Sequence, residues 1–189
     1  MEALAQLDGN ILLFIQEYVR LDWMTPIWTA ITSLANDGWF WIVLSIILLI
    51  PKKTRKAGIA ALLALLINLF FTNIALKNLV ARTRPYDVIK GLEVLIDKLS
   101  SFSFPSGHTA CSFAAAFAYY KCLPKKKWGI AALVLAGLIG FSRLYVGVHY
   151  PTDVLGGAAV GMLAAWIASK FISWIDGKMN KKKKRKKKK

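Results

Sequence analysis

Residues 104–153 have the sequence FPSGHTACSFAAAFAYYKCLPKKKWGIAALVLAGLIGFSRLYVGVHYPTD. Two long apolar runs in this stretch adjoin short polar islands, at residues 105–108 and 142–153. The islands hold both histidines of the chain, His108 and His149, and Asp153 follows His149 by four residues. Histidine is the side chain that most readily gains and loses a proton near neutral pH. The stretch therefore predicts packed apolar segments with titratable groups at their ends.

The composition is that of a membrane protein. The chain has 189 residues, enough for one domain, and 56% of them are hydrophobic and gathered in runs. A run of about 20 apolar residues is long enough to span a bilayer. We therefore expect an all-α fold, a polytopic helical bundle forming one membrane-embedded domain over residues 1–177. Cys111 and Cys122 show no metal-ligand spacing and imply no disulfide.

Five apolar runs are expected to cross the membrane, and the beginning of the chain leaves a sixth span open. The five runs cover residues 39–50, 57–76, 107–120, 128–145 and 154–175. Before them, residues 11–15 and 27–35 are apolar but too short to span alone. We expect amphipathic helices in the membrane interface there, where Trp23 and Trp28 are favoured. The alternative is one irregular span, which raises the count to six.

Residues 86–104 are too polar to span. Their apolar side chains, among them Leu92, Leu95 and Leu99, recur at helical spacing. The spacing predicts an amphipathic helix that lies on the membrane beside the polar islands. The alternative is a plain surface connector.

The net charge of +16 comes largely from the end of the chain. Lys178 and residues 181–189 supply ten of the 26 basic residues, and the rest of the chain carries about +6. We expect residues 178–189 to form a disordered polybasic tail near anionic lipids. A solvated topology anchor is the alternative. A nucleic-acid-binding arm fits a membrane protein less well, so we expect no nucleic-acid partner.

The basic residues also orient the spans. If the spans alternate, the basic loops at residues 51–56 and 121–127 share one side with the tail. The positive-inside rule makes that side the cytoplasm. We therefore expect a multi-pass protein of the cell membrane with a cytoplasmic C-terminus. The extracytoplasmic face then receives the candidate site residues, which are Lys77, Arg84, His108, Arg143, His149 and Asp153.

Three cations at this face suit a phosphate group. Lys77, Arg84 and Arg143 supply positive charge, and an arginine fork binds two phosphate oxygens at once. Taken singly, each cation is equally well explained as an interfacial anchor. Their convergence on one face is what favours a phosphate site.

A helix N-terminus adds to the site. Ser106 can cap the helix that begins after it, so that the backbone N–H groups of Gly107 and His108 point at an anion. Gly107 also lets the backbone approach the anion closely. The alternative is that His108 only caps the helix.

Two histidines permit a division of labour in phosphate hydrolysis. We expect His149 to attack phosphorus, because Asp153 can accept one ring N–H and leave the other nitrogen free. His108 then acts as general acid, and afterwards as base for the attacking water. No metal or other cofactor is required, since Asp153 is the only acid within the polar islands. The alternative is that Asp153 only caps the last helix.

Three segments together resemble the signature of the type 2 phosphatidic acid phosphatase (PAP2) superfamily. They are Lys77-x6-Arg84-Pro85, Pro105-Ser106-Gly107-His108 and Ser142-Arg143-x5-His149-x3-Asp153, in order and in spacing. The resemblance implies an all-helical membrane fold and metal-independent dephosphorylation of a lipid through phosphohistidine. It implies the same residue roles and adds Ser142 to the phosphate-binding set. Arg82 occupies no fixed position of the signature and is left out, so Arg82→Ala is expected to be mild.

The substrate follows from the resemblance and the short loops. The chain looks like bacterial members that convert undecaprenyl diphosphate to undecaprenyl phosphate in the recycling of the cell-wall carrier lipid. Phosphatidylglycerophosphate phosphatase and a broad-specificity phosphatidic acid phosphatase are the alternatives. A catalytically silent lipid-binding protein is a distant one, since every catalytic position is filled.

Overall fold

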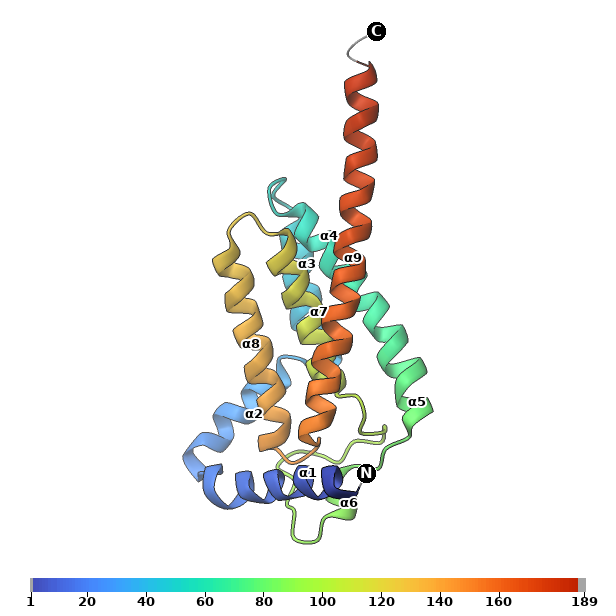
Figure 1. Ribbon diagram of the computed structural model, residues 1–189. Helices are drawn as coiled ribbons and strands as arrows, with labels where there is room; N and C mark the ends of the chain where they lie inside the picture. The colour runs from blue at the N-terminus through green and yellow to red at the C-terminus, as the bar shows by residue number, and fades with distance from the viewer. Residues whose placement is uncertain (1, 187–189) are drawn as a thin grey trace.

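The computed structural model describes the backbone of residues 2–186 and the side chains of residues 3–178. Within these residues all regular structure is helical, as expected. Most helices stand side by side in a bundle, and α1 (Glu2–Phe14) lies across one end of it (Figure 1). The all-α bundle predicted from the sequence is confirmed.

Helix α7 (Gly107–Cys122) is the centre of the bundle. It packs against α4 (Arg55–Leu69), α8 (Lys126–Tyr145) and α9 (Pro151–Lys186), and its alanines are largely buried. The helices approach closely because small residues face one another. A Cβ atom at Gly161 of α9 would lie only 2.2 Å from the carbonyl oxygen of Ala110 in α7. Helices in lipid commonly pack through small residues in this way.

Helix α3 (Trp39–Leu49) packs on α4 and is joined to α7 by polar contacts. Trp41 is fully buried and donates its Nε1–H to Oγ of Ser112 at 2.9 Å. One turn further on, Oγ of Ser45 lies 2.7 Å from the hydroxyl of Tyr119. Such bonds between helices satisfy polar groups that have no water nearby.

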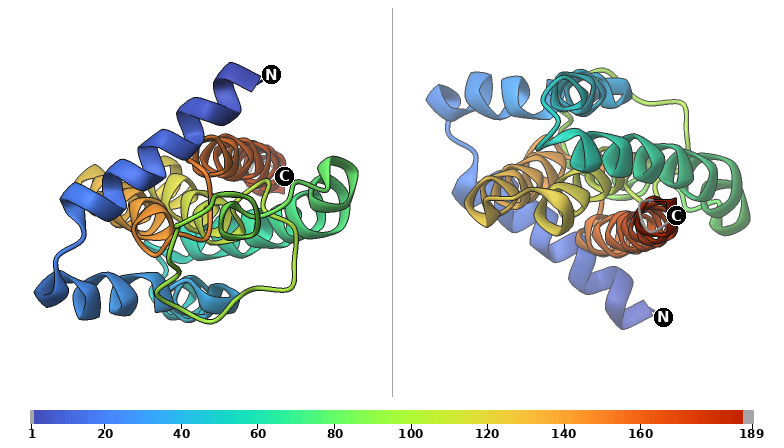
Figure 2. Two further views of the ribbon diagram at one scale, coloured as in Figure 1. Left: turned by 90° about the horizontal axis from the view of Figure 1, so that it is seen from below. Right: turned by 90° about the horizontal axis from the view of Figure 1, so that it is seen from above.

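The beginning of the chain forms the helices predicted there. Helix α1 crosses the end of the bundle and passes into a π-helical turn, Ile15–Val19 (Figure 2). A short turn (Asp22–Met24) and α2 (Thr25–Ser33) then lead back toward α3, through a further turn at Asn36–Gly38. Large apolar side chains of this region, including Leu7, are exposed, as expected of helices that face lipid.

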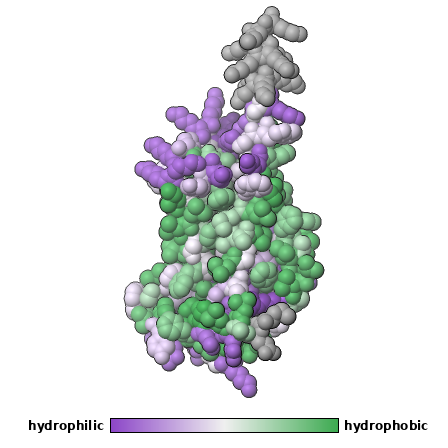
Figure 3. Space-filling view, viewed as in Figure 1, coloured by the Kyte–Doolittle hydropathy of each residue, from purple (hydrophilic) through white to green (hydrophobic). Residues whose placement is uncertain are grey.

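Among the described residues, three helical stretches are long and apolar enough to cross a membrane, namely Arg55–Val88, Lys126–Tyr145 and Pro151–Lys178. A further pair of helical segments, Asp22–Ser33 and Asn36–Leu49, is bent by 47° at the break between them. The pair makes a fourth span if its halves cross the membrane together. Helix α7 has 16 residues, fewer than the ~20 that a span needs. The count of five to six spans therefore stays a prediction. Figure 3 shows a broad hydrophobic band between two more hydrophilic ends.

The prediction of an amphipathic helix over residues 86–104 is wrong. Helix α6 (Pro85–Val88) is one turn, and the residues after it form a loop. Gly91 has a φ of 81°, which ends a helical path. The apolar residues of the loop pack on the C-terminal end of α8 and on α1 instead, as Leu92 does beside Leu12. Helical spacing here reflects contact with neighbouring helices.

Helix α9 is continuous from Pro151 to Lys186. The backbone of residues 178–186 is therefore helical, whereas the sequence predicts a disordered tail there. Lysine is a good helix former, and extending an existing helix requires no new nucleation. Residues 187–189 of the predicted tail lie outside the described part of the chain. The α3–α4 and α7–α8 turns, which hold the basic loops, share the α9 C-terminal end of the bundle (Figure 1).

Candidate active site

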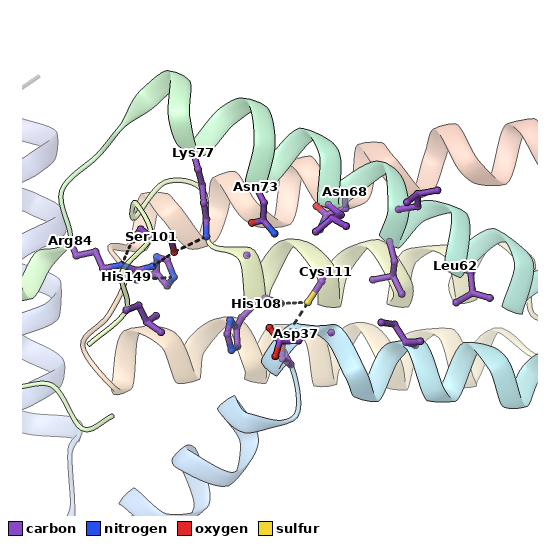
Figure 4. A pocket seen from close by; sticks show the side chains of 18 residues that line it. Asp37, Leu62, Asn68, Asn73, Lys77, Arg84, Ser101, His108, Cys111 and His149 are labelled. Atoms are coloured by element: carbon purple, nitrogen blue, oxygen red, sulfur yellow. Dashed lines mark hydrogen bonds between the residues drawn. The ribbon is translucent and has the colours of Figure 1, made fainter. Parts of the chain in front are cut away.

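A cavity of about 590 Å³ lies between α3, α4 and α7. One end of it is charged and is lined by Lys77, Arg84, His108 and His149 (Figure 4). The other end is apolar, and its lining includes Ile42, Leu62, Leu65, Leu66 and Leu69. The cavity thus joins a polar pocket to an apolar channel, a shape suited to a molecule with a charged head and an apolar tail.

The first two cations come from the segment that follows α4. This segment begins with a π-helical stretch, Phe70–Leu76, and the single turn α5 (Lys77–Val80), and it ends at Arg84, directly before α6. Lys77 Nζ donates to Oγ of Ser101 at 3.1 Å. Arg84 is buried, and its guanidinium donates to the carbonyl oxygens of Ser101 at 2.7 Å and Val148 at 2.9 Å. Neutral oxygens therefore fix the guanidinium in place and leave its charge uncompensated.

The third cation stands at the end of α8 and has free donors. Arg143 is 1% exposed, and its Nη1 donates to Oγ1 of Thr32 at 2.5 Å. Within the described part of the chain, its Nε and Nη2 have no hydrogen-bond partner. Buried donors are nearly always paired in folded proteins, so an exception calls for an explanation. An anion bound beside Arg143 would supply the missing acceptors.

The His149–Asp153 pair is formed as the spacing predicts. His149 lies in the connection between α8 and α9, and Asp153 lies in the first turn of α9; both are buried. Nδ1 of His149 is 3.4 Å from Oδ2 of Asp153, a long hydrogen bond. The same oxygen accepts from Oγ of Ser103 at 2.5 Å and from the backbone N–H of Tyr150 at 2.9 Å. The carboxylate is thus held from three directions.

The other ring nitrogen of His149 is on the side of the cations. Nε2 lies 3.5 Å from Nη1 of Arg84. Burial lowers the pKa of His149 to about 3, and the charges of Arg143 and Arg84 add to the lowering, against the opposing effect of Asp153. The imidazole is therefore neutral at physiological pH. A neutral imidazole with Nδ1 held by a carboxylate presents a nucleophilic lone pair at Nε2.

The second histidine lies on the first turn of α7. Ser106 is the N-cap of this helix, and its Oγ accepts from the backbone N–H of Thr109, as the sequence predicts. Gly107 and His108 line the cavity. Nε2 of His108 is 2.9 Å from Oδ1 of Asn36, and this contact orients the imidazole.

Four residues of the predicted set do not line the cavity, and two of them, Ser106 and Ser142, serve their own helices. Ser142 is fully buried and donates to the carbonyl oxygen of Ile139 in its own helix at 2.6 Å. Ser106 serves the start of α7, as described above. Of the other predicted residues, Lys77, Arg84, Gly107, His108 and His149 line the cavity, while Arg143 and Asp153 are buried next to them.

Several residues of this site were not predicted from the sequence. Ser101 and Ser103 contact Lys77, Arg84 and Asp153, but they stand in a stretch without a recognisable pattern. Arg82 was set aside, yet its Nη1 donates to Oδ1 of Asp153 at 2.7 Å. Its position two residues before Arg84 was the available signal. Among the described residues, no group of three or more His, Cys, Asp and Glu side chains is placed to hold a metal ion.

Comparisons with known proteins identify the family of this chain. The sequence profile of the PAP2 superfamily matches residues 57–176. The undecaprenyl-diphosphatase of Sulfolobus acidocaldarius is 34% identical over 128 residues, which is 68% of this chain and 60% of that protein. Phosphatidylglycerophosphatase B of Bacillus subtilis is 35% identical over 163 residues, which is 81% of this chain and 77% of the relative.

A solved structure is also similar. It is the crystal structure of a transmembrane PAP2-type phosphatidylglycerolphosphate phosphatase from Bacillus subtilis, with a TM-score of 0.76 and 32% sequence identity. The similarity covers 93% of this chain and 89% of that one. The arrangement of helices described above is therefore shared with an experimentally determined membrane protein.

Proposed function

The chain belongs to the PAP2 superfamily, and from this premise we propose that it is a metal-independent lipid phosphatase with His149 as its nucleophile. The observation that carries the proposal is the cavity, in which Lys77, Arg84 and two imidazoles meet an apolar channel. Arg143, with its unpaired donors, is buried next to this charged end. Its named relatives are lipid phosphatases, including an undecaprenyl-diphosphatase and a phosphatidylglycerophosphatase. The polar end would take the phosphate and the apolar channel the lipid chain.

In the first step Lys77, Arg84 and Arg143 hold the phosphate oxygens. Nε2 of His149 attacks the terminal phosphorus, and the bond from that phosphorus to the leaving oxygen breaks. For a diphosphate this is the bridging oxygen, which departs with the lipid monophosphate. His108 donates a proton to that leaving oxygen. Asp153 accepts the Nδ1–H of His149 and stabilises the positive charge that the ring acquires. Fixed cations around the phosphoryl group lower the barrier because they need not reorganise during the reaction.

In the second step water hydrolyses the phosphohistidine. His108, now deprotonated, accepts a proton from water as its oxygen attacks phosphorus, and the bond from Nε2 of His149 to phosphorus breaks. Inorganic phosphate leaves, and both histidines return to their starting state. The first-turn N–H groups at Gly107 and His108 suit the same oxyanions, because helix N-termini favour negative charge.

We propose undecaprenyl diphosphate as the first substrate, with undecaprenyl phosphate as the product returned to cell-wall synthesis. The name of the Sulfolobus relative and the chain's short loops support this choice. Phosphatidylglycerophosphate is the second candidate, and one observation favours it. The Bacillus relatives of that name align over more of both chains, up to 93% of this one.

The proposed membrane orientation places the site on the extracytoplasmic face. The basic turns of the bundle gather at the end opposite α1 and the charged end of the cavity, which suits the positive-inside rule (Figures 1 and 3). Lys178 and the lysines that follow it in the sequence would then meet anionic lipids of the cytoplasmic leaflet.

Phosphate release by the purified protein in detergent tests the proposal. The assay contains EDTA and compares undecaprenyl diphosphate, phosphatidylglycerophosphate and phosphatidic acid, with His149→Ala as the inactive control. We expect release in EDTA and inhibition by vanadate, which resembles pentavalent phosphorus in the transition state. Preference for a glycerolipid would favour phosphatidylglycerophosphate, the second candidate, over undecaprenyl diphosphate as the substrate. A strict requirement for magnesium, or no release from all three lipids, would overturn the proposal.

A further inference from the structure

An ion-pair network lies behind Asp153, on the side away from His149, and its two carboxylates are buried while its arginine is partly exposed. Arg82 is its centre. Its Nη1 donates to Oδ1 of Asp153 and to Oγ1 of Thr152, each at 2.7 Å. Its guanidinium also stacks on the ring of Tyr150, with 3.9 Å from Cζ to the ring centroid. Arg82 therefore contacts three of the four residues at 150–153, where the chain enters α9.

The other end of the network is a carboxylate of α1. Asp8 is 2% exposed, and its Oδ2 accepts from Nη2 of Arg82 at 2.7 Å. Oδ1 of Asp8 accepts from the backbone N–H of Thr152 at 3.1 Å, and Oδ2 accepts from the Thr152 hydroxyl. The N–H of Thr152 is one of the free donors at the start of α9. Asp8 thus caps α9 from a different helix.

We propose that Asp8 is a positioning residue for the Asp153–His149 pair and acts through Arg82. The inference rests on the proposed function, because it assigns Asp8 to the reaction that His149 performs. The two oxygens of Asp153 have separate partners: Oδ2 faces His149, and Oδ1 is held by Arg82. Arg82 fixes the rotation of the carboxylate, and Asp8 fixes Arg82.

Charge balance gives Asp8 a second effect. Arg82 alone would neutralise the charge of Asp153 and weaken its attraction for the imidazolium that forms on His149. Asp8 compensates Arg82, so that the three groups together keep one net negative charge beside the nucleophile. Electrostatic interactions of this kind are strong at a buried site, where water screens them little.

The position of α1 depends on apolar contacts as well. Leu12, one turn after Asp8, is fully buried in a cluster with Leu92 and Tyr150. Asp8 is therefore presented by a helix that is packed against the site end of the bundle. The exposed Glu17, in the π-helical turn that follows, makes no side-chain hydrogen bond or ion pair among the described residues, and it provides a matched control.

The test compares Asp8→Asn, Arg82→Gln, the double variant and Glu17→Gln, with initial rates of phosphate release from the preferred lipid. We expect Asp8→Asn to lower kcat about tenfold, equivalent to ~1.4 kcal/mol, with an unchanged KM and unchanged vanadate inhibition. Glu17→Gln should match the wild type. The double variant should be no slower than Arg82→Gln alone, because Asp8 acts through Arg82.

Each contrary result has a distinct meaning. Equal kcat for Asp8→Asn and Glu17→Gln overturns the inference, and so do losses from Asp8→Asn and Arg82→Gln that multiply. The kcat of Asp8→Asn is also calculated per active site that can form phosphohistidine. If the loss disappears on that basis, the role of Asp8 is purely structural and the inference is overturned. If Asp8→Asn does not fold, Thr152→Val removes the hydroxyl that both side chains share, and the same loss with unchanged KM is required. Wild-type protein without phosphatase activity overturns the proposed function instead.

Discussion

The cations on the two sides of the His149–Asp153 pair differ in their partners. Lys77, Arg84 and Arg143 form no salt bridge within the described part of the chain, and Arg143 has two buried donors without any acceptor. Arg82 forms two salt bridges, each of 2.7 Å, to Asp8 and Asp153. Arg82 and Arg84 stand two residues apart in the sequence, yet they belong to opposite sets.

This difference separates binding from positioning. Uncompensated charges near one another are unfavourable, and a phosphate with two negative charges relieves them when it binds. A cation that already has two carboxylates gains little from a further anion. The first set is therefore arranged for a ligand and the second for the protein itself, and the two sets meet at His149.

The largest effect is expected at that meeting point. His149→Ala removes the proposed nucleophile, and we expect phosphate release to fall by about 10³-fold or more. Vanadate binding, measured by calorimetry, should be weakened far less, because the cations remain. Activity within tenfold of the wild type would mean that another group attacks phosphorus.

The next largest effect is expected among the cations without carboxylate partners, Lys77, Arg84 and Arg143. Arg143→Gln removes the buried unpaired donors, and we expect kcat/KM to fall about 100-fold or more, with vanadate inhibition weakened in parallel. Thr32→Val is the control, since it removes the partner of Nη1 and keeps the guanidinium. If Thr32→Val were as harmful, the contact between α2 and α8 would be the important feature, rather than the charge.

A smaller effect is expected at Arg82, the cation that is paired with two carboxylates. The sequence predicts a mild effect for Arg82→Ala, and the contact with Asp153 raises the expected loss of kcat to about tenfold. Vanadate inhibition should stay at the wild-type level, in contrast to Arg143→Gln. A loss of vanadate affinity equal to that of Arg143→Gln would place Arg82 among the ligand-binding cations and end the distinction.

The smallest effect concerns stability against pH. The pKa of His149 is lowered to about 3 in the folded protein, from an unfolded value of ~6.5. Between these values the unfolded state binds the proton and the folded state does not, so the free energy of unfolding decreases as pH falls from 6.5. We expect the thermal midpoint in detergent to drop by several degrees more for the wild type than for His149→Gln between pH 7 and pH 5. Parallel curves for the two proteins would contradict the lowered pKa.

The sequence predicted those parts of the site that depend on local spacing or on alternation of the spans. His149 and Asp153 meet because four residues make one turn, and Ser106 caps α7 because it precedes an apolar helix. Lys77 and His108 lie at the end of the bundle opposite the basic turns, which is the arrangement that alternating spans predict. Membership of the superfamily and the all-α fold, both expected from the same residues, are confirmed.

The missed parts depend on contacts between distant residues. Asp8 and Thr152 are 144 residues apart, and neither belongs to a pattern that points to the other. Arg82 and Arg84 look alike in sequence, and their roles are separated only by the partners that the fold brings to them. The loop after α6 shows helical spacing because its apolar residues fill gaps between other helices, a cause that periodicity cannot distinguish from a helix.

The link between Asp8 and the start of α9 has a consequence for biogenesis. The ribosome makes α1 early, whereas Thr152, which Asp8 contacts, and Asp153, which Arg82 contacts, emerge only after α8 has been completed. Until then Asp8 can pair with Arg82 but has no contact with α9, and α1 can wait at the membrane surface as an amphipathic helix. When α9 is added, Asp8 caps it, Arg82 gains Asp153 as a second partner, and the surroundings of His149 are completed at the same time. A nascent chain that stops before α9 therefore holds the three cations of the first set but lacks the carboxylate beside His149.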